Sequence, residues 1–209
     1  MNVCRVTVAA ALALALAGCA GPGEVLTFSA SVKAVPAPAK ASHALRVAVA
    51  SFEDVRADKT AIGRYQHYVE TRVDQLVPES GSAAEQITAF VADYLARAGF
   101  QVTRVPADGA VPTGSADVML MGQIESYWNE AVTRFFRTEL ISKNRLVIQA
   151  SNASDGSAVR TSVAGEATTV VVCFCLTDLE TLNNVALAQS LSRFLDEVTV
   201  SGQRLVPRR

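Results

Sequence analysis

The sequence predicts an α+β domain, with a mostly antiparallel sheet and two helices packed on one face. Residues 82–98 and 187–198 each carry one apolar face at helical spacing, which predicts the two helices. Residues 139–152 and 158–169 are long β-rich stretches, and Asp155-Gly156 between them is a turn signal typical of an antiparallel hairpin. The expected order is strand, strand, helix, strand, several antiparallel strands, helix.

The first half of the domain opens on a strand at residues 45–49, where larger apolar residues alternate with small or charged ones. Residues 53–82 favour strand, although their apolar residues also fit a helical stripe. The first predicted helix begins at a capping box formed by Ser82 and Glu85, and it ends before Gly99, the usual residue after a helix.

The second half continues with β-structure. Residues 101–105 predict a strand that leaves the helix, and residues 118–128 predict a strand with one apolar face. Residues 129–138 link this strand to the next one. We expect Phe135 and Phe136 in that link to be buried, because large aromatic side chains contribute strongly to cores.

Composition excludes two classes of protein. The chain has 209 residues, half of them hydrophobic, and 19 basic side chains against 20 acidic ones give a net charge of −1. High apolar content with low net charge argues against global disorder. The absence of a basic excess argues against nucleic acid as a partner, because phosphate binding needs one.

Residues 1–18 read as a lipoprotein signal peptide. Arg5 precedes residues 6–17, an uncharged and mostly apolar run. Such a run is typical of a secretory signal and is short of the roughly 20 residues that span a membrane. Leu16-Ala17-Gly18-Cys19 then resembles a bacterial lipobox, so cleavage is expected between Gly18 and Cys19.

Cys19 is therefore the predicted lipidation site, where fatty acyl chains such as palmitate would attach. Two or more buried acyl chains hold a protein stably on a bilayer, whereas a single chain binds reversibly. The next residue is Ala20 rather than Asp, and by resemblance to the sorting rule of enteric bacteria this favours the outer membrane. The alternative is an ordinary signal peptide, or an uncleaved anchor, in which Cys19 is incidental.

The mature chain divides into three predicted parts. Residues 19–44 comprise the lipidated cysteine and a flexible tether, because they are rich in Ala, Pro, Ser and Gly. The alternative for residues 25–32 is a short strand docked on the domain. Residues 45–201 form a single α+β domain that faces the periplasm, and residues 202–209 form a frayed tail.

Cys173 and Cys175 leave three readings open. The first is two buried free thiols in the apolar run of residues 170–176. The second is a disulfide, which needs a tight turn, because an extended i, i+2 pair lies about 6.5–7 Å apart. The third is a redox or soft-metal role, although a tetrahedral site would lack its remaining cysteine ligands.

Asp54, Arg56, Asp58 and Lys59 form a charge cluster directly after the first strand, and they are weak candidates for binding. The alternative is a solvated, ion-paired turn. The sequence contains no nucleophile elbow, phosphate-binding loop or dinucleotide fingerprint, and its two histidines have no metal-ligand spacing. We therefore expect no metal, no cofactor and no enzymatic activity.

Several short motifs resemble the YajG-type family of small bacterial outer-membrane lipoproteins. They are the strand Leu45-Arg46-Val47-Ala48-Val49, the turn Asp54-x-Arg56-x-Asp58-Lys59, the pair Ile62-Gly63, the helix end Gly99-Phe100, and Ala116-Asp117 before a strand. The resemblance implies a place in the cell envelope more than a mechanism. Cys173 and Cys175 lie outside its pattern.

The expected function is that of a lipid-anchored envelope lipoprotein, acting as a non-enzymatic binding or accessory module on the periplasmic face of the outer membrane. Its expected partners are the membrane, through the lipid anchor, and an envelope protein. One alternative is an accessory subunit of an envelope transport or secretion complex. The other is an enzyme whose site lies in the loop of residues 53–63 or at Cys173 and Cys175.

Overall fold

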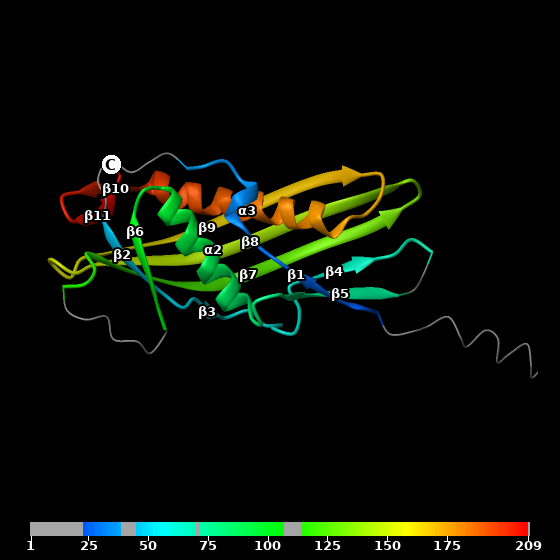
Figure 1. Cartoon of the computed structure of the whole chain (residues 1–209), viewed down its shortest axis with the longest axis horizontal. Coiled ribbons are helices and arrows are strands. Elements are labelled where there is room, and N and C mark those ends of the chain that lie inside the picture. The colour runs from blue at the N-terminus through cyan, green and yellow to red at the C-terminus, as the bar shows by residue number, and fades with distance from the viewer. Residues whose placement is uncertain (1–22, 39–44, 70–71, 107–113, 209) are drawn as a thin grey trace, which may run out of the picture.

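The computed structural model describes residues 23–38, 45–69, 72–106 and 114–208. Its frame is a meander of three long strands, β7 (Val118–Arg134), β8 (Arg137–Asn152) and β9 (Ala158–Val171), each antiparallel to the next (Figure 1). The predicted hairpin around Asp155-Gly156 is confirmed, and Gly156 adopts the left-handed φ of 70° that such a turn favours.

The other edge of β7 accepts short strands one after another, all parallel to it: β2 (Arg46–Ala50), β3 (Glu53–Asp54) and β4 (Gly63–Gln66). Outside these lie β6 (Gln101–Val105), parallel to β2, and β5 (Val73–Pro78), antiparallel to β4. The domain is α+β as predicted. Its sheet is mixed, because β7 is long enough for successive short strands to pair along one edge while β8 occupies the other.

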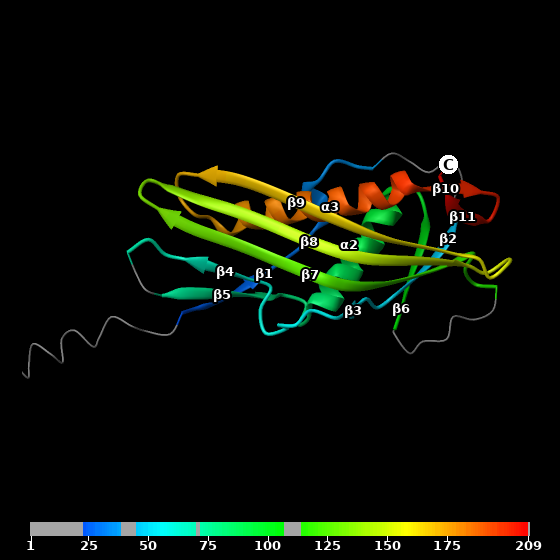
Figure 2. The same cartoon turned by 180° about the vertical axis from the view of Figure 1, so that it is seen from behind.

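Two helices contribute to the core, α2 (Ala83–Arg97) and α3 (Leu176–Glu197). The predicted cap of α2 is confirmed, because the Ser82 hydroxyl accepts a hydrogen bond of 3.1 Å from the backbone N–H of Glu85. Seen from behind, β7, β8 and β9 lie in front of both helices, so no described helix covers this side of the three long strands (Figure 2). We call this side the open face.

The flexible tether predicted for residues 19–44 is wrong for residues 23–38. Residues Val25–Phe28 form β1, which pairs parallel with β5, and Val32–Ala34 form a 3-10 turn, η2. Phe28 is fully buried, and the Asn184 side chain of α3 accepts a hydrogen bond from the Ser31 N–H. Buried apolar residues therefore outweigh the Pro and Gly content that predicted a tether. Cys19, Gly18 and the signal peptide lie outside the described residues.

The C-terminal tail is also not frayed. Residues Val198–Ser201 (β10) and Arg204–Pro207 (β11) form an antiparallel hairpin, so the domain extends beyond residue 201. Its Leu205 is buried and exchanges hydrogen bonds with the Asn152 side chain at the end of β8. This pairing between side chain and backbone gave no periodic signal in the sequence.

Phe135 and Phe136 are exposed, which contradicts the prediction that they are core residues. No link separates the two long strands, because β7 runs to Arg134 and β8 begins at Arg137. The two phenylalanines are the whole turn, at one end of the sheet. Within the described part of the chain, no helix combines the length and the hydropathy that a membrane crossing requires.

Candidate functional site

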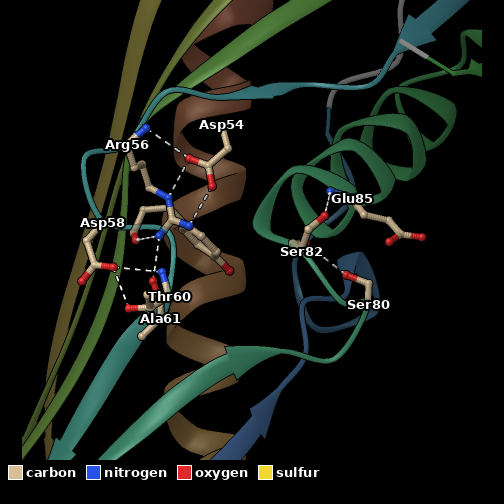
Figure 3. A network of polar contacts seen from close by, with 9 residues as sticks. Asp54, Arg56, Asp58, Thr60, Ala61, Ser80, Ser82 and Glu85 are labelled. Carbon is tan, nitrogen blue, oxygen red and sulfur yellow. Dashed lines mark hydrogen bonds and ion pairs between the residues drawn. The ribbon is translucent and has the colours of Figure 1, made fainter. Parts of the chain in front are cut away.

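The charge cluster predicted from the sequence forms a structural clamp in the loop after β3 (Figure 3). The Arg56 guanidinium donates two parallel hydrogen bonds to the Asp54 carboxylate, at 2.9 Å and 2.8 Å. It also donates to the backbone carbonyls of Ala61, at 2.9 Å, and of Tyr127 on β7, at 3.3 Å. The side chains of Arg56 and Asp54 are only 6% and 15% exposed. Arg56 therefore fixes its loop to the central strand.

The electrostatics of Asp54 agree with this structural role. Burial alone would raise the pKa of Asp54, but the hydrogen bonds and charge of Arg56 outweigh burial and lower it. The carboxylate thus stays ionised and paired at neutral pH. A general acid or base needs a pKa near the working pH, and Asp54 is shifted away from that range.

Asp58 and Lys59 do not join the clamp. The Asp58 carboxylate accepts hydrogen bonds from the backbone N–H and the hydroxyl of Thr60, and these bonds lower its pKa. This is a local turn of the type that Asp commonly forms. Lys59 is exposed, and the turn carries it on the surface. The structure therefore splits the predicted cluster into a buried pair and two surface residues.

Cys173 and Cys175 are exposed free thiols in the turn between β9 and α3. Exposure contradicts the reading of two buried residues. Cys175 occupies the cap position before α3, and its Sγ lies 2.9 Å from Thr177 Oγ1. The two thiols are not bonded to each other in the structure, so a disulfide between them stays a prediction for the oxidised protein. The described residues contain no group of three potential metal ligands.

A buried polar network that the sequence did not predict lies between the helices and the sheet. The Gln86 amide of α2 donates a 2.9 Å hydrogen bond to the Tyr127 hydroxyl. Ser142 Oγ on β8 donates to Asn129 Oδ1 at 2.8 Å, and Asn183 of α3 lies beside it. Burial raises the pKa of Tyr127 to about 12, so its hydroxyl stays protonated.

No local pattern in the sequence marks this network. A register shift in β7 between Ile124 and Ser126 changes which residues face the core, and it turns Tyr127 and Asn129 inward. Their polar side chains at core positions could be found only once that shift was known. The network is enclosed, and it orders the core rather than presenting groups to a ligand.

The open face carries a hollow of about 280 Å³ at the end of β2. Its floor is built by cross-strand neighbours that share this side of the sheet, because Met121 pairs with Gln149, and Gln149 pairs with Arg160. Val147 is also on the floor. Met121 is 42% exposed, so a sulfur-containing apolar side chain is presented to solvent there.

The two rims of the hollow carry opposite charges. Glu53 of β3 lies on one rim, where its carboxylate accepts a 2.8 Å hydrogen bond from the Gln123 amide. Arg160 of β9 lies on the other, with β7 and β8 between them. An apolar floor between an acid and a base suits an extended peptide segment, in which an apolar side chain is flanked by charged groups.

Comparisons with known proteins found remote structural similarity alone. No protein-family model matches the chain, and neither does any curated protein. Protein XCC0632 from Xanthomonas campestris, of family DUF330, covers 83% of this chain and 93% of its own, at 12% identity and a TM-score of 0.46.

Two further solved structures are similar at a comparable level. The PelC dodecamer from Paraburkholderia phytofirmans matches 75% of this chain and 94% of its own, at 19% identity and a TM-score of 0.40. Lipoprotein GNA1162 from Neisseria meningitidis matches 73% and 96%, at 10% identity and a TM-score of 0.38. Bacterial lipoproteins are thus among the similar structures, and similarity this remote assigns no function.

Proposed function

We propose that this chain is a lipid-anchored lipoprotein of the YajG type, which lies on the periplasmic side of the outer membrane and binds an envelope partner without catalysing a reaction. The lipobox ending at Cys19 supports the anchor. The anchor is durable if Cys19 carries more than one acyl chain.

The hollow on the open face is the observation that carries the binding role. Met121 and Val147 offer apolar contact, and Glu53 and Arg160 offer charges of both signs. Trp128 lies seven residues farther along β7 than Met121, outside the hollow, and is 37% exposed. Apolar and aromatic side chains in a polar surround are typical of protein interaction sites. We propose that an extended segment of an envelope protein binds here.

Site-specific crosslinking in living cells tests this role. A photoreactive phenylalanine analogue at Met121 should give a discrete crosslinked product, because a bound partner would lie against the floor of the hollow. Arg160→Glu in the same chain should lower the yield about tenfold by reversing one rim charge. The yield is measured by immunoblot after irradiation.

The matched control places the same analogue at Asp196, an exposed residue of α3 on the helix side. It should give no product. Equal products from both positions, or a Met121 product that Arg160→Glu leaves unchanged, would contradict a partner site in the hollow.

A further inference from the structure

One end of the molecule carries an unusual concentration of exposed apolar side chains. They come from the β4–β5 loop, the β7–β8 turn, and the end of β9 with the β9–α3 turn, which reach the same end of the sheet in both views (Figures 1 and 2). Each is between 56% and 86% exposed. We call this set the hydrophobic tip: Tyr68, Val69, Phe135, Phe136, Val170 and Val172.

Aromatic contacts hold the three loops together. The rings of Tyr68 and Phe135 lie 6.3 Å apart between centroids, which joins the β4–β5 loop to the β7–β8 turn. Tyr65 of β4 stacks on Phe174 at 4.0 Å, which joins β4 to the β9–α3 turn. The segments that carry the hydrophobic tip therefore contact one another, and the apolar residues of the tip remain exposed to water.

The turn between β7 and β8 adds a conformational cost. Phe136 has a φ of 56°, in the left-handed region that ordinary residues avoid and that two-residue turns usually fill with Gly or Asn. Phe135 packs edge-on against it, with ring centroids 4.1 Å apart. An exposed aromatic pair in a strained turn does not stabilise the fold. We therefore infer that the pair contacts something outside the domain.

The path of the chain indicates what the tip contacts. Gly23 lies against the backbone of Val73, and Val73 pairs with Gln66, two residues before Tyr68. The described chain thus enters the domain at the end that carries the hydrophobic tip. Cys19 precedes Gly23 by four residues. At a maximum of about 3.6 Å for each residue, these four reach about 14 Å, so a lipid on Cys19 would hold this end close to the bilayer.

Charge at the tip suits an anionic membrane. Arg134 and Arg137 are exposed and face one another across the β7–β8 turn, directly beside the two phenylalanines. Glu139 is the next acidic residue along β8, two positions farther from the turn. Basic side chains beside inserted apolar ones are the usual composition of an interfacial membrane contact.

We propose that the hydrophobic tip inserts into the surface of a phospholipid bilayer and so fixes the orientation of the domain, with Phe135 and Phe136 among the acyl chains and Arg134 and Arg137 at the headgroups. This rests on the proposed anchor at Cys19, to which it adds a second attachment. The long strands then project away from the membrane and carry the open face with them.

Vesicle binding by unlipidated protein tests the tip apart from the anchor. The chain purified without residues 1–19, and therefore without signal peptide or lipid, should partition onto vesicles of phosphatidylethanolamine and phosphatidylglycerol. Phe135→Ser with Phe136→Asn should lower the partition coefficient at least about tenfold, while the thermal midpoint does not fall, because Asn tolerates the left-handed turn.

Val55→Ser is the matched control. Val55 is 43% exposed, and its backbone N–H donates a hydrogen bond to the carbonyl of Ile124 on β7, which precedes Phe135 by eleven residues. Val55 therefore lies away from the hydrophobic tip, and its substitution should leave vesicle binding unchanged. Trp128 is the only tryptophan. In a Trp128→Phe background, Phe135→Trp introduces the single tryptophan at the tip. On vesicles, the fluorescence emission of this tryptophan should shift to the blue, and brominated lipids should quench it.

Two outcomes would overturn the proposal. One is equal vesicle binding by the parent and the double tip variant. The other is a dimer of the same unlipidated chain that the tip variant abolishes and that binds no vesicles, which would assign the tip to a second copy. The intact mass of the wild-type protein reports lipidation of Cys19 independently of vesicle binding. It therefore shows whether the anchor is present even if the tip proposal fails.

Discussion

Arg56→Leu should destabilise the domain by about 3–5 kcal/mol, the cost of removing one partner from a buried ion pair. The substitution leaves the Asp54 carboxylate without its bidentate donor, and it leaves the carbonyls of Ala61 and Tyr127 without the Arg56 N–H groups. Leucine restores no hydrogen bond. Denaturant unfolding followed by circular dichroism measures the loss.

The control for this variant is Arg64→Leu. Arg64 pairs with Glu130, with its Nε 2.6 Å from the carboxylate, but its side chain is 48% exposed. An exposed pair contributes at most about 1 kcal/mol. If the two substitutions lowered the free energy of unfolding by the same small amount, the result would show that Arg56 does not fix its loop to β7. Arg56 would then become a candidate for binding again.

Gly165→Ala should cost about 3 kcal/mol, the upper end of the usual range for overpacking. A Cβ on Gly165 would lie 1.8 Å from the backbone oxygen of Ala186 in α3 and 3.0 Å from the Asn144 amide nitrogen. Backbone cannot rotate away as a flexible side chain can, so α3 and β9 would have to separate. The free energy of unfolding in denaturant reports this cost.

Gly156→Ala provides the comparison. Gly156 lies in the β8–β9 turn at φ 70°, and nothing lies within 4 Å of the position its Cβ would take. Its substitution should cost about 1 kcal/mol, from backbone strain alone. A Gly165→Ala protein no less stable than Gly156→Ala would show that α3 does not need this close approach to the sheet.

Local patterns predicted most of the elements correctly. The capping box at Ser82 and the turn at Asp155-Gly156 depend on a few neighbouring residues, so the sequence alone identifies them. The parallel pairing of β2, β3 and β4 along β7 joins residues far apart in the chain. No local period encodes such contacts, and the mixed sheet was therefore not predicted.

The errors arose where tertiary contacts override composition. The Pro-rich N-terminal stretch docks because Phe28 and Val35 find buried positions. Phe135 and Phe136 were expected inside because they are large and apolar, yet the β7–β8 turn places them in solvent. The charge cluster of Asp54 and Arg56 was a reasonable candidate for binding by its position, but in the folded chain each of the two side chains pairs with the other.

The intact mass of protein extracted from its native membrane tests the central claim most directly. We predict a chain that begins at Cys19 and is heavier than the polypeptide by a diacylglycerol group and an acyl chain, whereas Cys19→Ser keeps its signal peptide and carries no lipid. A wild-type mass without any lipid addition, or a Cys19→Ser chain that loses its signal peptide as the wild type does, would contradict the anchor.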